Sequence, residues 1–201
     1  SSGTSARAVA LSSVGGASNA PTVALKVMVS EIDRHVICFG ANTIGSSSVD
    51  PLLVRWSDQE NAINWTPTAT NSAGGQVLSA GNAIIGAVKT RQEILIGTDV
   101  GITSMRFVGA PFIFAFAPVA ENVGFISPNA AISSGDAVYF MDSGGFYVYK
   151  GAVQRLPCSV HRYVFDNLNK SQAFKVFAVH SADYSEVTWY YPVGTGATDI
   201  T

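Results

Sequence analysis

The feature that most constrains the fold is a unit of short strands that recurs along the chain. Each unit contains a strand, a polar turn, a second strand, a tight hairpin and a third strand, and the strands are rich in Val, Ile, Phe, Tyr and Trp. No 3.6-residue periodicity is sustained, so helices are not expected to carry the fold. The second strands of four successive units are expected to begin near His35, Ile94, Ala137 and Val187.

The spacing of these units predicts the fold class. They recur roughly every 40 to 60 residues, and a propeller blade of four antiparallel strands recurs at about 40 to 50. Insertions at residues 41–50 and 57–81 account for the long first interval. We therefore expect an all-β, β-propeller-like array of about four partial blades over residues 21–201, an incomplete propeller or a fragment of a longer chain. A β-sandwich, which also has many short strands, is the alternative.

The first twenty residues differ from the rest of the chain. Residues 1–20 are almost all small, with one charged side chain, Arg7. Such a segment buries little apolar surface and loses much conformational entropy on ordering. We expect a low-complexity linker or arm that becomes ordered only through contacts with its neighbours.

The balance of apolar and charged residues bears on partners. Apolar residues make up 47% of the chain and charged residues 13%, about half the usual share. A free monomer would expose an unusually neutral surface, so we expect a large assembly that covers much of it. The net charge of −2 gives no basic field for gripping nucleic acid. The longest apolar stretch, residues 108–120, is interrupted by Pro111 and Pro118 and predicts a buried or edge strand, not a membrane span.

Two hairpins have a recognisable turn chemistry. In "TDVG" and "DSGG" an Asp side chain can accept a hydrogen bond from the backbone two residues on, and Gly can supply a positive φ. Asp99 and Gly101, and likewise Asp142 and Gly144, are therefore predicted to be turn residues.

The stretch "VRWSDQENAINWTP" is the most unusual in the chain. It resembles in part the Asp-box hairpin of sialidase-like propellers, without the glycine of that motif and with a longer offset between Asp58 and Trp65. Ser57 and Asp58 can satisfy turn amides, and Trp65 can fold back over the strand that carries Trp56. We predict a structural clamp made of Trp56, Ser57, Asp58 and Trp65, in preference to a carbohydrate-binding shelf.

No pattern of catalytic or metal-ligating residues is evident. The three histidines, His35, His161 and His180, lie in separate segments without the spacing of a zinc site. Cys38 and Cys158 are too few and too far apart for a disulfide framework, so buried free thiols are expected. We predict a non-enzymatic protein without catalytic, cofactor-binding or metal-binding residues. The less favoured alternative is a pair of carboxylates that cleaves sugars.

Four stretches carry a resemblance to a known family. They are "DPLLVRWSDQENAINWTPTATNSAGGQ", "TRQEILIGTDVGITSMRFVGAPFIFAF", "ISPNAAISSGDAVYFMDSGGFYVYKGAVQRLPCSV" and "EVTWYYP". Together they resemble virion structural proteins of tailed bacteriophages, similar to the tail-hub, nozzle or head-completion proteins of short-tailed phages. Members of that family form rings beneath the portal and are generally longer than this chain.

The resemblance implies a mechanical function in the phage tail or neck. It predicts a hub, nozzle or adaptor ring that extends or seals the DNA exit channel and seats other tail parts. The implied partners are copies of the chain, the portal or adaptor, other tail proteins and, in passing, phage DNA, and the implied location is the virion. The alternatives are a carbohydrate-binding or carbohydrate-cleaving propeller used in receptor recognition and, less favoured, a bacterial envelope scaffold.

Overall fold

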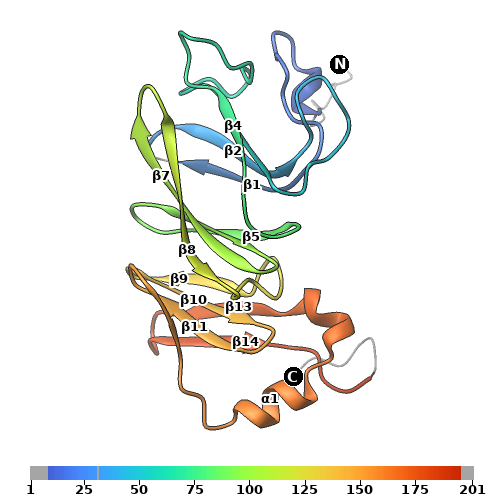
Figure 1. The fold of residues 1–201 in the computed structure, drawn as a ribbon, viewed down its shortest axis with the longest axis vertical. Coiled ribbons are helices and arrows are strands. Elements are labelled where there is room, and N and C mark those ends of the chain that lie inside the picture. The colour runs from blue at the N-terminus through green and yellow to red at the C-terminus, as the bar shows by residue number, and fades with distance from the viewer. Residues whose placement is uncertain (1–8, 31, 196–201) are drawn as a thin grey trace, which may run out of the picture. The chain divides into compact units, whose positions relative to one another are not determined.

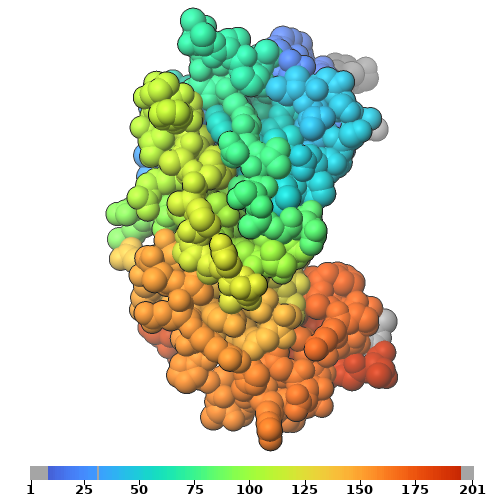
Figure 2. All heavy atoms as spheres, in the orientation of Figure 1, coloured from blue at the N-terminus to red at the C-terminus, as the bar shows by residue number. Residues whose placement is uncertain are grey.

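The protein is all-β, as the repeat of short strands predicts. The structure, a computed structural model, describes residues 9–30 and 32–195, and strands dominate in that part of the chain. Contacts divide the chain into two compact units, Ser1–Leu78 and Ser79–Thr201. The first unit runs from blue to green and the second from green to red in both the ribbon and the space-filling view (Figure 1, Figure 2).

The first unit is built on one four-stranded antiparallel sheet whose strands are neighbours in chain order (Figure 1). The register pairs Val27 with Cys38 and Cys38 with Arg55, so these three side chains share one face of the sheet. Phe39 and Val54, both fully buried, lie on the other face. The elements of this unit are the short helix η1 (Leu11–Ser13) and the strands β1 (Ala24–Ser30), β2 (His35–Ala41), β3 (Leu53–Trp56) and β4 (Gly74–Val77).

The described part of the N-terminal segment, residues 9–20, is attached to the first unit. The backbone N–H of Trp65 donates to the carbonyl of Ser18 at 3.0 Å, and the N–H of Ser18 donates to the carbonyl of Ile63 at 2.9 Å. Ala20 is buried in a cluster with Trp65. The neighbours that hold this part of the predicted arm therefore belong to the same chain, while residues 1–8 lie outside the described residues.

The described part of the second unit, residues 79–195, contains three antiparallel sheets, and in each of them the strands again follow chain order (Figure 1). The first two sheets have four strands each and the third has two. The first comprises β5 (Ile84–Lys89), β6 (Ile94–Thr98), β7 (Gly101–Gly109) and β8 (Ile113–Glu121). The second comprises β9 (Ala131–Ser134), β10 (Ala137–Asp142), β11 (Gly145–Tyr149) and β12 (Val153–Arg155). The remaining elements are α1 (His161–Asn167), η2 (Lys170–Lys175), β13 (Phe177–Ser181) and β14 (Glu186–Tyr190).

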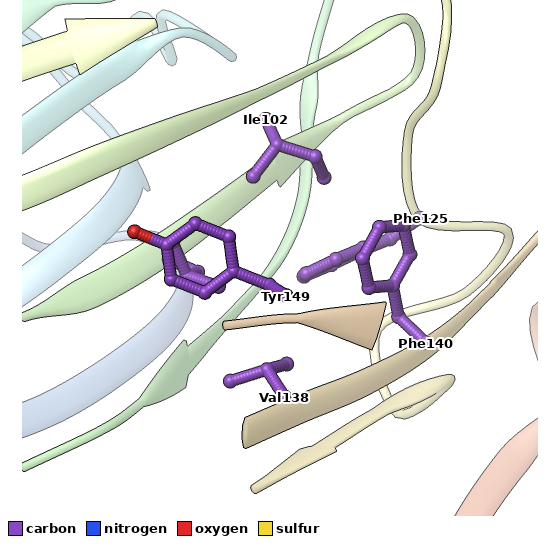
Figure 3. Packing of buried hydrophobic residues seen from close by; sticks show 6 residues of the cluster. Ile102, Phe125, Val138, Phe140 and Tyr149 are labelled. Carbon is purple, nitrogen blue, oxygen red and sulfur yellow. The ribbon is translucent and has the colours of Figure 1, made fainter. Parts of the chain in front are cut away.

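The core of the second unit lies between its two four-stranded sheets. Leu95 and Ile102 from the first sheet meet Val138, Phe140 and Tyr149 from the second, and the ring of Phe125 lies among them (Figure 3). Gly97 makes room for that ring, since a Cβ at this position would lie 2.3 Å from it. On the other side of β10, a second hydrophobic cluster fills the space toward α1 and β14. It includes Met141, Val164 and Leu168, and Trp189 packs against it.

The predicted strand positions agree with the structure, but some elements were not predicted. β2, β6, β10 and β14 begin at His35, Ile94, Ala137 and Glu186. Residues 57–81 are not simply an insertion, because they contain β4. The described strands form four separate sheets and do not close into a propeller, so the propeller and the sandwich both stay predictions.

Three smaller expectations concern single segments. β8 is an edge strand, which is one of the two strand types predicted for the apolar stretch 108–120. Pro118 lies within β8, where the missing backbone N–H is tolerated because an edge strand has only one hydrogen-bonded neighbour. Cys38 is a buried free thiol, as predicted. Cys158 is free but only partly buried, because it lies in the segment between β12 and α1 and not in a strand.

Candidate functional site

The loop between β3 and β4 is closed by a carboxylate. Asp58 Oδ1 accepts hydrogen bonds from Ser72 N at 2.9 Å, Ser72 Oγ at 2.8 Å and Gln59 N at 3.0 Å. Burial raises the pKa of Asp58, but the hydrogen bonds from Ser72 and Gln59 outweigh burial, and the pKa lies below its ordinary value. Ser57 Oγ, next in the chain, accepts from Val36 N at 3.0 Å. Both residues satisfy backbone amides around the loop.

The two tryptophans of the predicted clamp are both buried. Trp65 is 1% exposed and lies against Arg55, whose Cζ is 5.9 Å from the centroid of the indole ring. Trp56 is 6% exposed, and its Nε1 donates to the carbonyl of Ser72 at 2.8 Å. Because Arg55 and Trp56 alternate along β3, the two indoles lie on opposite faces of the sheet. Neither ring offers an exposed face for stacking on a sugar, and their role as a clamp stays a prediction.

A histidine beside this loop gives it a superficial likeness to a catalytic triad. His35 Nε2 lies 3.1 Å from Ser72 Oγ, and Ser72 Oγ contacts Asp58. In a catalytic triad the serine hydroxyl donates to the histidine and the acid orients the histidine. Here the hydroxyl of Ser72 donates to Asp58, so the acid contacts the serine, and the side chain of His35 is fully buried. These contacts tie Ser72 to His35 of β2 and to Asp58, and so close the loop.

The hairpin between β10 and β11 uses Asp142 as predicted. Its Oδ2 accepts from Gly144 N at 3.3 Å, two residues on. Its Oδ1 also accepts from Gly124 N at 3.4 Å, which ties the hairpin to the segment before β9.

The hairpin between β6 and β7 is built differently from the prediction. The Asp99 carboxylate accepts from Asn82 N and Asn82 Nδ2, both at 2.8 Å, and not from the backbone two residues on. Thr98 Oγ1 takes over the local contact and accepts from Gly101 N at 2.9 Å. Neither Gly101 nor Gly144 has a positive φ, so the conformational reason expected for these glycines was wrong.

A buried carboxylate in the second unit was not singled out from the sequence. Glu93, just before β6, accepts hydrogen bonds from Tyr149 Oη at 2.6 Å and from the hydroxyl of Ser104. Arg106 Nη2 lies 3.2 Å from the same carboxylate, and the Glu93 side chain is 9% exposed. Since Ser104 and Arg106 are on β7 and Tyr149 is on β11, Glu93 joins the two four-stranded sheets of this unit.

A polar cavity opens beside Glu93. It has a volume of about 490 Å³, and Arg91, Gln92, Asp136 and Tyr149 contribute to its wall. Arg91 and Asp136 form an exposed ion pair with 3.4 Å between nitrogen and oxygen. The cavity therefore presents donors and acceptors for hydrogen bonds, with little apolar surface for an apolar ligand.

The contacts around Glu93 shift two pKa values in opposite directions. Burial raises the pKa of Glu93, but the hydrogen bonds from Ser104, Tyr149 and Arg106 outweigh burial, so the pKa lies below its ordinary value of 4.5. Burial and the hydrogen bond to Glu93 raise the pKa of Tyr149 to about 12. The folded state thus favours an ionised Glu93 and a neutral Tyr149.

These shifts predict a stability that falls at both ends of the pH range. The contribution of Glu93 is present above pH 4.5 and is lost as the pH falls through its lower folded pKa. The contribution of Tyr149 is present below its ordinary value of 10.0 and is lost as the pH rises toward about 12. Unfolding free energies from urea titrations at several pH values should show a shallower acid decline in Glu93→Gln and a shallower alkaline decline in Tyr149→Phe.

The control for this prediction is Tyr184→Phe, since Tyr184 belongs to the same unit and is 77% exposed. It should leave the alkaline decline unchanged. Equal alkaline declines in Tyr149→Phe and the wild type would mean that the Tyr149 to Glu93 hydrogen bond does not contribute to stability.

The remaining histidines lie apart from one another. His180 Nε2 is 2.9 Å from Ser134 Oγ, and His161 Nε2 is 2.8 Å from Arg155 Nη2. Within residues 9–30 and 32–195, no three His, Cys, Asp or Glu side chains are grouped so that they could hold a metal ion. None of the helices in these same ranges has the length and hydrophobicity of a membrane span.

No protein-family model matches the sequence, and a search of curated proteins finds no match.

Proposed function

We propose that the chain is a non-enzymatic structural subunit of a bacteriophage tail or neck. In this role it packs against copies of itself in a hub, nozzle or adaptor ring, extends or seals the DNA exit channel and seats other tail parts. The proposal rests on the resemblance of the four sequence stretches and on one structural observation, an uncovered apolar strand in the first unit.

That observation concerns β1, which is an edge strand of its sheet. Leu25, Val27 and Val29 alternate along it on one face and are 51%, 57% and 56% exposed. An exposed, apolar edge strand is a site at which chains associate, and soluble monomers usually protect such edges with charges, Pro or a covering element. The β1 apolar face, as we call these three residues, therefore supports a chain that works in contact with neighbours.

The composition supports the same proposal. Only 13% of the residues are charged, so few like charges oppose close packing between copies. A near-neutral chain also suits a channel through which DNA must slide, because neutralising many phosphates with Lys and Arg would retain the DNA.

The proposal predicts that a charge on the β1 apolar face reduces self-association. Val27→Asp would bury an unpaired carboxylate wherever two copies meet on this face, which is costly. Sedimentation velocity over a range of concentrations should show wild-type oligomers and a shift to monomer in Val27→Asp. Circular dichroism would confirm that the variant keeps its β content.

The matched control is Ala69→Asp, which adds the same charge to an exposed turn of the same unit. It should associate as the wild type does. If the wild type stays monomeric at every concentration, or if both variants associate equally, the β1 apolar face is not an association surface.

A second candidate function is carbohydrate binding, and the polar cavity beside Glu93 favours it. Its wall offers the guanidinium of Arg91, the amide of Gln92 and the carboxylate of Asp136, groups that hydrogen-bond to sugar hydroxyls. Retention on a glycan array that is lost in Arg91→Ala would support this candidate. An array without retained glycans would count against it.

A further inference from the structure

Arg55 is a buried cation in the middle of β3. Its residue is 2% exposed, Nη1 donates to the carbonyl of Asn42 at 3.0 Å, and Nη2 donates to the carbonyl of Asn19. A guanidinium has five N–H donors, and both of these acceptors are neutral. Within the part of the chain that the structure describes, Arg55 forms no ion pair.

Among the residues that the structure describes around Arg55, none neutralises its charge. Cys38 faces it across β2 and β3, but burial raises the pKa of the Cys38 thiol to about 11, so the thiol is neutral near pH 7. Trp65 contributes the face of its ring, which attracts a cation without cancelling its charge. Burial lowers the pKa of Arg55, yet an arginine stays protonated in proteins. A buried charge without a counter-ion is costly, and buried charges are normally paired.

Arg55 lies in the wall of a cavity that can hold an anion beside its guanidinium. The cavity has a volume of about 330 Å³, whereas a water molecule occupies about 30 Å³ in the liquid. Among the described residues that line it, Arg55 alone carries a charge, and Thr22, Thr43, Ser46 and Ser47 bring hydroxyl groups. The cavity therefore carries one positive charge, offers several hydroxyl groups and is large enough for a small hydrated ion.

The wall of the cavity is held in place by Asn42. Its Oδ1 accepts from Thr22 N at 2.9 Å and from Val23 N at 3.1 Å, and its Nδ2 donates to the carbonyl of Ser46 at 2.7 Å. This one buried side chain fixes the segments on two sides of Arg55. The site is thus organised before a ligand arrives, which reduces the entropy lost on binding.

We propose that the Arg55 cavity binds a small oxyanion, a group such as phosphate, sulfate or carboxylate whose oxygens accept hydrogen bonds from the guanidinium. The planar guanidinium matches the oxygens of such groups, and the surrounding hydroxyls can donate to the others. The inference does not depend on the proposed function in a phage tail.

The experiment is thermal unfolding followed by tryptophan fluorescence, with inorganic phosphate, sulfate and acetate in separate arms. Each salt is titrated against chloride at constant ionic strength. Binding at ten times Kd should raise the Tm of the first unit by about 5 °C or more, and the rise should saturate. General exclusion of phosphate or sulfate from the protein surface also stabilises proteins, but it does not saturate at low concentration.

Two variants separate site binding from general salt effects. Arg55→Met should lose the saturable rise, whereas Arg34→Met, at an exposed arginine of the same unit, should retain it. If Arg55→Met does not fold, Ser47→Asp replaces it, because it puts a carboxylate on the cavity wall. Ser47→Asp should melt at a higher temperature than the wild type in chloride and respond little to the added anions.

The salt whose Tm rise saturates at the lowest concentration identifies the preferred oxyanion. The proposal is overturned if the wild type shows no saturable rise with any of the three salts, or if Ser47→Asp responds to them as the wild type does.

Discussion

Replacing Trp65 by alanine is expected to destabilise the first unit by about 3–5 kcal/mol, the usual effect of removing a large buried aromatic side chain. Trp65 is 1% exposed and packs with Ala20, Cys38 and Ala41. Its loss would leave a cavity between the N-terminal segment and the sheet, and it would remove the ring that faces Arg55. Urea unfolding followed by fluorescence can detect the change, because Trp56 remains as a probe in the same unit.

The control for this prediction is Val49→Ala, a substitution in the same unit at a side chain that is 47% exposed. Its effect should lie within about 0.5 kcal/mol of zero. A loss below about 1 kcal/mol in Trp65→Ala would show that the indole is not the anchor of a clamp, since a buried aromatic residue of that size contributes more.

Replacing Phe140 by alanine should destabilise the second unit by a similar amount, about 3–5 kcal/mol. Phe140 is fully buried between the two four-stranded sheets (Figure 3). Its ring centroid lies 5.3 Å from that of Phe125 and 5.4 Å from that of Tyr147, distances typical of favourable aromatic pairs. Fluorescence of Trp189, the tryptophan of this unit, follows the unfolding.

Phe112→Ala is the matched control, because Phe112 is in the same unit and 77% exposed. It should change the free energy of unfolding by less than about 0.5 kcal/mol. Equal losses in Phe112→Ala and Phe140→Ala would contradict a core that lies between the two sheets.

Much of the fold could be predicted from the sequence because its strands follow local rules. Apolar and β-branched runs bounded by turn residues placed the starts of β2, β6 and β10 at His35, Ile94 and Ala137. β4 was missed because Gly74–Val77, "GGQV", contains one residue with high strand propensity. Helix α1 was missed because seven residues are too few to show a 3.6-residue period.

The candidate sites were harder to predict, because they depend on contacts between distant residues. No sequence motif marks Glu93, because its partner Tyr149 lies 56 residues away. Asp99 was assigned to its own turn, but it bonds Asn82, 17 residues earlier. For Arg55 the sequence did hold a signal, a single charge inside the apolar run "LLVRW", which is unusual in a buried strand.

We propose that the chain functions by packing among neighbouring subunits and does not carry out a reaction. Electron microscopy of the purified protein tests it most directly. We expect rings or stacked tubes built of repeated copies. A field of uniform single particles at all concentrations, from a protein that also retains a specific glycan, would contradict the claim.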